Sequence, residues 1–178
     1  MRLARVRFKL GGHQTSSRKA CAMPGPLQLD HFLCFTVYST EHAFTQFYRP
    51  LLDEIGLTYP QYLAMVSLWS RDDRTIKEIG EALSLESNTL TPLVKRLEAL
   101  DLVSRARDAQ DERQVRVRLT QKGRELEARA ECIPFCVADA LGMPLEELVD
   151  LRHRLTLVEK RLRESTEKRV PARTREPG

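Results

Sequence analysis

The stretch that decides the fold is TIKEIGEALSLESNTLTPLVKRLEALDLVSRARDAQDERQVRVRLT, residues 75–120. It opens with Thr75 and Glu78, whose spacing is that of a capping box and predicts the start of a short helix. A second helix is expected to begin near Ser87, which can act as its N-cap, and to continue to Leu100. Two short helices joined by about four residues fit a helix-turn-helix.

Beyond the second helix the spacing of apolar residues changes from about 3.6 residues, typical of a helix, to two residues, typical of a strand. The alternation predicts strands over 102–107 and 114–119, joined by a polar hairpin over 108–113. A hairpin that directly follows the second helix of a helix-turn-helix is a wing. The sequence therefore predicts a winged helix-turn-helix over 60–119.

Helical patterns flank this unit on its N-terminal side. Asp30 is expected to cap a helix that ends between Pro50 and Gly56. A further helix is expected to follow Thr58, with Pro60 in its first turn. The residues between that helix and the capping box, 71–74, are expected to form a polar break.

Helical patterns also follow the wing. Thr120 is expected to cap one helix, Pro134 to interrupt or restart it, and a long helix is expected over 145–163. Apolar residues repeat at threes and fours along this last helix, at Leu148, Leu151, Leu155, Val158 and Leu162. This stripe exceeds what one small winged domain can cover, so we expect a homodimer. The predicted fold is mainly α with a small β-wing, with 27–58 and 120–166 mainly as dimerisation helices.

The charge is concentrated at the two ends of the chain. The formal net charge is +4, yet residues 1–26 carry six Lys/Arg and no acid, and 159–178 carry seven Lys/Arg against four acids. Residues 27–158 then hold 16 basic and 21 acidic residues, a net charge of −5. Any nucleic-acid contact must therefore rest on local charge. We interpret 1–26 as a disordered basic leader, with Met23 as an alternative start, and 167–178 as a disordered tail.

Composition excludes several classes of protein. Apolar residues make up 42% and charged residues 30%, as in globular proteins, and no apolar run reaches the roughly 18 residues of a membrane helix. We expect a cytoplasmic protein that is not an enzyme and has no cofactor. In such a chain, Cys21, Cys34, Cys132 and Cys136 do not form a disulfide framework, and nothing near them completes a metal site.

The second helix of the pair offers short polar and basic side chains that suit phosphate and base-edge contacts in a major groove. They are Ser87, Asn88, Thr89, Thr91, Lys95 and Arg96. The hairpin adds Arg105, Arg107, Arg113, Arg116 and Arg118, and an arginine at a wing tip can enter a narrow minor groove. Asp111 is expected to orient Arg113. Singly, each residue fits an ordinary solvated surface, but their order on this scaffold predicts binding to double-stranded operator DNA.

Two interpretations of Cys34 follow from its surroundings. Its apolar neighbours Phe32, Leu33 and Phe35 suit a buried core thiol, which is the usual fate of a free cysteine. A position in the first turn of a helix favours the reactive thiolate instead, although an Asp30 cap would oppose this. The residues alone leave both interpretations open.

A resemblance to a known family distinguishes them. The segments LDHFLCFTVYS (29–39), YRPLLD (48–53) and LTYPQY (57–62) resemble the organic-hydroperoxide-resistance repressors, a branch of the MarR family. Residues 87–98 and 111–120 resemble the recognition helix and wing of MarR proteins generally, and the similarity extends from Leu27 to Leu162. The thiol-plus-tyrosine set is the part typical of the peroxide-sensing branch.

The resemblance implies a role for individual residues. Cys34 matches the thiol that an organic hydroperoxide oxidises, after which the repressor releases its operator. Tyr48 and Tyr59 match two tyrosines whose hydroxyl groups reach that thiol from the partner subunit, and Tyr38 matches a third pocket tyrosine. Without the resemblance, tyrosines at helical spacing are usually core residues.

One position departs from the family pattern. Two-cysteine members resolve the oxidised thiol with a second cysteine, whose place is held here by Asp139. Cys136 lies three residues earlier, close to one helical turn, and is the candidate resolving residue, with Cys132 as a weaker one. The other outcome is a one-cysteine sensor that ends as a mixed disulfide with a small thiol.

Two further hypotheses stay open at this point. The same fold is compatible with a repressor released by a small phenolic ligand, without redox chemistry. A thiol peroxidase is the third hypothesis, but no second acid–base group or arginine near Cys34 in the sequence suggests turnover.

Overall fold

The computed structural model describes residues 28–108 and 111–169 of the 178-residue chain. The expected basic leader, with Cys21, and residues 170–178 of the expected tail lie outside this range. The chain divides into two units, Met1–Tyr38 and Ser39–Gly178.

The first unit ends in a short 3-10 helix, η1 (Leu29–His31), and the beginning of α1 (Leu33–Asp53). The expectation that Asp30 caps α1 is wrong, because this residue lies inside η1. The carbonyl of Phe32 opens α1 instead and accepts the N–H groups of Phe35 and Thr36 at 3.0 and 3.2 Å. Cys34 is therefore the second residue of α1.

The second unit contains the helix-turn-helix. α2 (Tyr59–Ser70) begins after Thr58, and α3 (Ile76–Leu83) begins with the predicted capping box. The Thr75 hydroxyl accepts the Glu78 N–H at 3.1 Å, and the Glu78 carboxylate accepts the Thr75 N–H at 2.7 Å. These two reciprocal bonds satisfy N–H groups that the first turn leaves free.

The second helix of the motif, α4 (Ser87–Ala99), is continuous although Pro92 lies inside it. Ser87 was expected to cap this helix, and that expectation is wrong. The N-cap is Glu86, whose backbone is extended and whose carbonyl accepts the N–H groups of Thr89 and Leu90 at 3.0 Å each. Ser87 is therefore the first residue of α4, one position inside the helix.

The wing is part of a three-stranded antiparallel sheet. Its strands are β1 (Arg74–Thr75), β2 (Val103–Arg107) and β3 (Val115–Leu119), in the order β1-β3-β2. β2 and β3 confirm the predicted hairpin, with Arg105 opposite Val117. β1 was not predicted, because its two residues, the last of the polar break and the first of the capping box, show no alternation; Thr75 pairs with Arg116.

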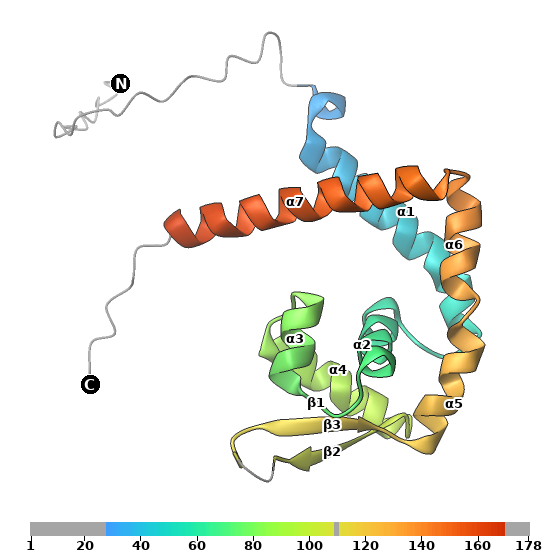
Figure 1. Ribbon diagram of the computed structural model, residues 1–178, viewed down its shortest axis with the longest axis vertical. Helices are drawn as coiled ribbons and strands as arrows, with labels where there is room; N and C mark the ends of the chain where they lie inside the picture. The colour runs from blue at the N-terminus through green and yellow to red at the C-terminus, as the bar shows by residue number, and fades with distance from the viewer. Residues whose placement is uncertain (1–27, 109–110, 170–178) are drawn as a thin grey trace, which may run out of the picture. The chain divides into compact units, whose positions relative to one another are not determined.

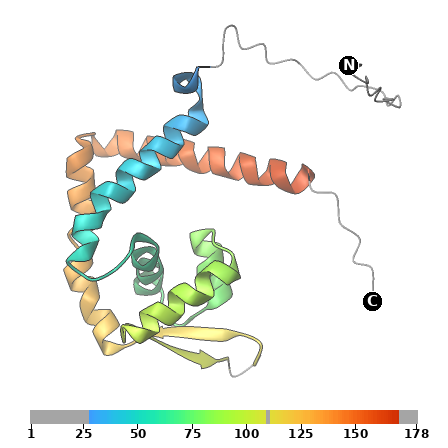
Figure 2. The same cartoon turned by 180° about the vertical axis from the view of Figure 1, so that it is seen from behind.

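The hydrophobic core lies where α2, α3 and α4 pack against the sheet, and Figures 1 and 2 show these helices grouped on one side of it. Met65 from α2, Leu97 from α4 and Val117 from β3 are fully buried. On β3 the neighbouring Arg118 is exposed, so the strand alternates as its sequence predicts. This packing places the outer face of α4 and the hairpin in solvent.

Three helices follow the wing: α5 (Gln121–Ala130), α6 (Ile133–Leu141) and α7 (Leu145–Arg169). Thr120 caps α5 as predicted, accepting the Gly123 N–H at 3.0 Å. α7 continues past its expected end, so residues 167–169 of the expected tail are helical. Within the described ranges no helix has the length and apolarity to span a bilayer.

Gly123 marks a close approach between α5 and the chain that leads into β2. Its carbonyl accepts the Trp69 indole N–H at 2.9 Å, and a Cβ atom at this position would collide with the Leu102 carbonyl oxygen. We predict that Gly123→Ala lowers the free energy of unfolding by about 1–3 kcal/mol, the usual cost of overpacking. Urea unfolding followed by circular dichroism measures this, with the exposed α5 substitution Glu127→Ala as control; equal stability of the two variants would contradict the prediction.

Candidate functional site

The exposed face of α4 carries the residues predicted to contact DNA. Ser87, Thr89, Lys95 and Arg96 are exposed, whereas Leu90, Leu93, Val94 and Leu97 on the opposite face are buried. Thr91 is only half-exposed and its hydroxyl donates to the Ser87 carbonyl at 2.8 Å. The structure therefore groups these residues on one solvent-facing surface, with the Thr91 hydroxyl already engaged.

Three of the five wing arginines are held by acids of the same chain. Arg105 pairs with Glu98 of α4, with 2.7 Å from Nε to Oε2. Arg116 and Arg118 both donate from Nε to Oδ1 of Asp73, at 2.7 and 2.9 Å. The sequence predicted that the hairpin presents all five arginines at its surface, and for these three the structure shows a partner within the protein.

The other two arginines, Arg107 and Arg113, are exposed, and neither takes part in an ion pair within residues 28–108 and 111–169. Asp111 was expected to orient the Arg113 guanidinium, but its carboxylate accepts the Arg113 backbone N–H at 3.1 Å and the Gln114 side-chain amide at 2.9 Å. Asp111 thus shapes the turn at the wing tip and leaves the Arg113 side chain in solvent.

The candidate sensing thiol lies in the first unit. Cys34 is exposed in the first turn of α1. This first turn contains no acidic residue. Tyr38, one turn later, is also exposed, and its ring stacks against Phe35 with 6.5 Å between centroids. The structure does not support a buried core thiol in the single chain.

The other two predicted pocket tyrosines lie in the second unit and form a cluster. The ring centroids of Tyr48 and Tyr59 are 4.7 Å apart, and Tyr62 lies 6.1 Å from Tyr48. Burial, and to a smaller extent the neighbouring Tyr59 and Tyr62, raises the pKa of Tyr48 to about 12. Burial is also the main cause that raises the pKa of Tyr59 and of Tyr62. At neutral pH these phenols therefore keep their protons and are hydrogen-bond donors.

The two C-terminal cysteines lie one turn apart at the start of α6. Cys136 is half-buried and Cys132 is exposed; the Cys136 N–H donates to the Cys132 carbonyl at 3.0 Å. Asp139 is exposed on the following turn. Over the ranges that the structure describes, no three His, Cys, Asp or Glu side chains gather as a metal site would require.

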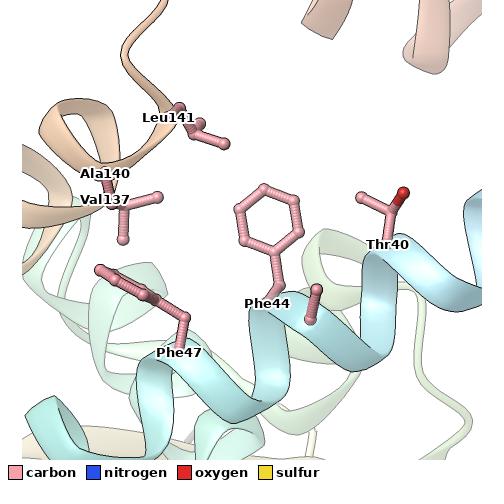
Figure 3. A pocket seen from close by; sticks show the side chains of 7 residues that line it. Thr40, Phe44, Phe47, Val137, Ala140 and Leu141 are labelled. Atoms are coloured by element: carbon pink, nitrogen blue, oxygen red, sulfur yellow. The ribbon is translucent and has the colours of Figure 1, made fainter.

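An apolar pocket of about 250 Å³ opens between α1 and α6. Figure 3 shows Phe44 and Phe47 of α1 facing Val137 and Leu141 of α6 across it. Thr40 supplies the polar side chain among the lining residues. The pocket therefore suits an apolar occupant.

Comparison with known proteins identifies the family. The profile of a family described as "Transcriptional regulator SarA/Rot" matches residues 46–129. The transcriptional regulator TtmR of Methylorubrum extorquens is 48% identical over 138 residues, which cover 78% of this chain and 71% of TtmR. The organic hydroperoxide resistance transcriptional regulator of Bacillus subtilis is 41% identical over 134 residues, covering 75% and 91%. The chain belongs to the MarR/SarA family of winged-helix transcriptional regulators.

Solved structures of AbfR from Staphylococcus epidermidis have the same fold as this MarR-type regulator. Reduced AbfR bound to DNA is 37% identical, with a TM-score of 0.66 over 75% of this chain and 92% of AbfR. The disulfide form of AbfR, also 37% identical, gives a TM-score of 0.52 over 76% and 90%. The predicted winged helix-turn-helix and the predicted family are both confirmed.

Sequence reasoning missed two groups of residues in this regulator. Tyr62 belongs to the tyrosine cluster, and the motif that carries Tyr59 also contains it, so the signal was present. Asp72 and Asp73 hold three arginines, but they occur in a polar break that no local pattern distinguishes from an ordinary loop. Their role depends on which strand comes to lie beside them.

We predict that Arg113→Ala weakens binding of operator DNA by about 1–3 kcal/mol, because a well-placed arginine contact is lost. Fluorescence anisotropy at physiological salt measures the affinity. Arg161→Ala, which removes an exposed arginine from α7, is the matched control and should bind as wild type does. If both variants bind equally well, the wing tip does not contact DNA.

Proposed function

We propose that this transcriptional regulator is a repressor that binds operator DNA as a homodimer and releases it when an organic hydroperoxide oxidises Cys34. The observation that carries the proposal is the exposed Cys34 thiol in the first turn of α1, in a chain 41% identical to an organic hydroperoxide resistance regulator. The solved reduced, DNA-bound form and disulfide form of AbfR add support from a second relative.

The DNA-binding part of the proposal rests on α4 and the wing. The exposed Lys95 and Arg96 supply positive charge on α4, in a protein whose residues 27–158 are acidic overall. Arg107 and Arg113, which form no ion pair with any other described residue, supply positive charge on the wing. α4 is the element that enters a major groove in a helix-turn-helix, and the wing then reaches the neighbouring backbone or minor groove.

The redox step is a two-electron oxidation of sulfur. The Cys34 thiolate attacks the terminal oxygen of the hydroperoxide, the O–O bond breaks, and the alkoxide takes up a proton and leaves as an alcohol. The sulfur is then a sulfenic acid and the peroxide has been reduced. An aromatic surrounding favours an organic hydroperoxide over hydrogen peroxide, because it can bind the organic group.

The tyrosine cluster is proposed to assist this step from the other subunit. The family resemblance implies that Tyr48 and Tyr59 of the partner subunit reach the thiol. Their raised pKa keeps the phenols protonated, so each can donate a hydrogen bond to the thiolate and later to the sulfenic oxygen. Oxidation then changes the hydrogen bonds of a pocket shared by two subunits, which couples it to the spacing of the two α4 helices.

A second thiol completes the switch in one of two ways. If Cys136 attacks the sulfenic sulfur, water leaves and a disulfide forms between subunits. Cys136 is half-buried on α6, and Asp139 holds the expected position of a resolving residue. Otherwise a small cellular thiol makes the same attack and leaves Cys34 as a mixed disulfide.

The homodimer is supported by apolar surface that a single chain leaves open. On α7, Leu151, Leu155 and Leu162 are 43, 46 and 64% exposed. Further apolar surface lies in the pocket between α1 and α6 and at Phe135, which is 72% exposed. Large exposed apolar surfaces are uncommon on a monomer and typical of a subunit interface.

We predict that Cys34→Ser binds the DNA upstream of its own gene as wild type does and stays bound when cumene hydroperoxide is added. Wild type is released, because only its thiol can be oxidised at this position. An electrophoretic mobility shift with and without the hydroperoxide measures both properties. Release of the Cys34→Ser variant by hydroperoxide would contradict redox sensing and support the phenolic-ligand alternative.

Three further variants belong in the same experiment. Cys132→Ser tests the weaker candidate for the resolving residue and should respond as wild type does. Tyr59→Phe should respond more slowly, because one donor to the thiolate is lost. On a non-reducing gel, loss of the oxidised covalent dimer in Cys136→Ser assigns the resolving role to Cys136, whereas wild type without such a dimer indicates a one-cysteine sensor.

We predict that the protein sediments at micromolar concentration as a dimer, with twice the 20.5 kDa mass of the chain. Leu155→Glu should shift it toward the monomer, because a charge would be buried in the interface. Lys160→Glu, an exposed charge change on the same helix, is the control and should leave the dimer intact. A wild-type monomer would rule out the proposed interface.

A further inference from the structure

Two adjacent aspartates after α2 bind three arginines from β3 and α5. Asp73 pairs with Arg116 and Arg118, and Asp72 pairs with Arg124, with 2.8 Å between Oδ2 and Nη2. Asp72 also accepts the Leu119 backbone N–H at 2.9 Å through its other oxygen. We call these five side chains the Asp-Arg cluster; it joins the loop before α3 to the strand that carries the wing.

Within this cluster, every guanidinium nitrogen of Arg116 has an acceptor. Its Nε donates to Asp73 Oδ1 at 2.7 Å and its Nη2 to the Asp73 carbonyl at 2.6 Å. Its Nη1 donates to Asp108 Oδ2 at 2.9 Å. Asp108 is the first residue of the wing tip, so Arg116 bridges from the helix-turn-helix to the beginning of the tip.

The backbone of Asp73 is arranged for this contact. Its φ of +56° is in the left-handed region, which is costly for a residue other than glycine but is tolerated by Asp and Asn. In this conformation Asp73 presents both its carbonyl and its carboxylate to Arg116. The hydrogen bonds from Arg118 and Arg116 lower the pKa of Asp73, so its charge persists at neutral pH.

At its base the hairpin is attached to the helices by buried apolar side chains of β2 and β3, and polar contacts add to this attachment. β1 contributes two residue pairs, Arg74 with Val117 and Thr75 with Arg116. Arg105 adds the ion pair with Glu98 of α4. An isolated two-stranded hairpin is marginally stable, and its direction is set by what it packs against. Holding the wing and the recognition helix at a set angle before binding lowers the entropic cost of ordering them on one DNA duplex.

We propose that Asp73 and Arg116 are positioning residues, which set the direction of the wing relative to α4 and act on DNA through Arg113 rather than by direct contact. This inference rests on the proposed operator binding. The proposal divides these wing arginines into two classes. Arg113 and Arg107 at the surface contact DNA, whereas Arg116 forms ion pairs within the protein and orients the wing that carries them.

The test is a double-mutant cycle with Arg116→Gln and Arg113→Ala, measured by anisotropy on a labelled fragment of the DNA upstream of the gene at several salt concentrations. Arg116→Gln should weaken binding about tenfold, within the range of coupled neighbours. For Arg116→Gln, the slope of log affinity against log salt concentration should equal that of wild type, since no phosphate contact is lost. Arg113→Ala should lower that slope by about 0.9 if its partner is a phosphate.

The cycle distinguishes positioning from mere stabilisation of the fold. If Arg116 acts through the wing tip, adding Arg116→Gln to Arg113→Ala costs no more than about twofold, because the contact that it positions is already gone. A general loss of stability would weaken both backgrounds equally. Arg129→Gln is the matched control: it removes an exposed arginine of α5 that lies outside the Asp-Arg cluster, and should bind as wild type does.

Further variants keep the test decisive if Arg116→Gln does not fold. Asp73→Asn retains the left-handed backbone and its carbonyl but loses the charge, and Asp108→Asn removes the tip-side ion pair alone. Both should weaken binding less than Arg116→Gln, with unchanged salt slopes. Additive effects in the cycle, a salt slope lowered by Arg116→Gln, or wild-type affinity in these variants would overturn the positioning role. Wild type that fails to bind the fragment would contradict the proposed function instead.

Discussion

The structure depends on the contact region where the end of α2, β3 and α5 pack together. The polar groups that meet there need hydrogen-bond partners within the protein. Asp72 accepts the Leu119 N–H and pairs with Arg124, and the Trp69 indole donates to the Gly123 carbonyl. A glycine is needed at 123 because the Leu102 carbonyl leaves no room for a Cβ. Since these contacts connect the helix before the helix-turn-helix to the helix after the wing, they hold the motif and its flanking helices as one body.

The same contacts explain why an arginine-rich hairpin offers little free positive charge. Each of three wing arginines forms an ion pair with an acid of the same chain: Arg105, Arg116 and Arg118. Their charges therefore attach the hairpin to the protein and add little to the positive electrostatic potential of its surface. The charge left for DNA is local, on α4 and at the wing tip. This agrees with the net negative charge of residues 27–158, which excludes a uniformly basic binding surface.

At the proposed sensing site, the property that matters is that the tyrosine phenols stay protonated. Burial holds the pKa of Tyr48 near 12 and raises that of Tyr59 and Tyr62, so the cluster supplies neutral donors. Neutral donors stabilise a thiolate and a sulfenic oxygen alike. In the single chain Cys34 is exposed. The proposal that tyrosines of the partner subunit reach this thiol would make the redox chemistry a property of the dimer.

The sequence by itself determined the order of elements, because caps and apolar periods are local. Thr75 with Glu78, and Thr120 with Gly123, act as their spacing predicts, and the alternation of Val117 with Arg118 appears in β3. The motif around Cys34 likewise indicated the family that the comparisons confirm. Tertiary structure decided what local patterns cannot encode: β1, the start of α1 after η1 rather than after Asp30, and the partners of the wing arginines. An arginine in a strand looks the same in sequence whether it faces DNA or Asp73, because its partner lies some forty residues away in the chain and only folding brings the two together.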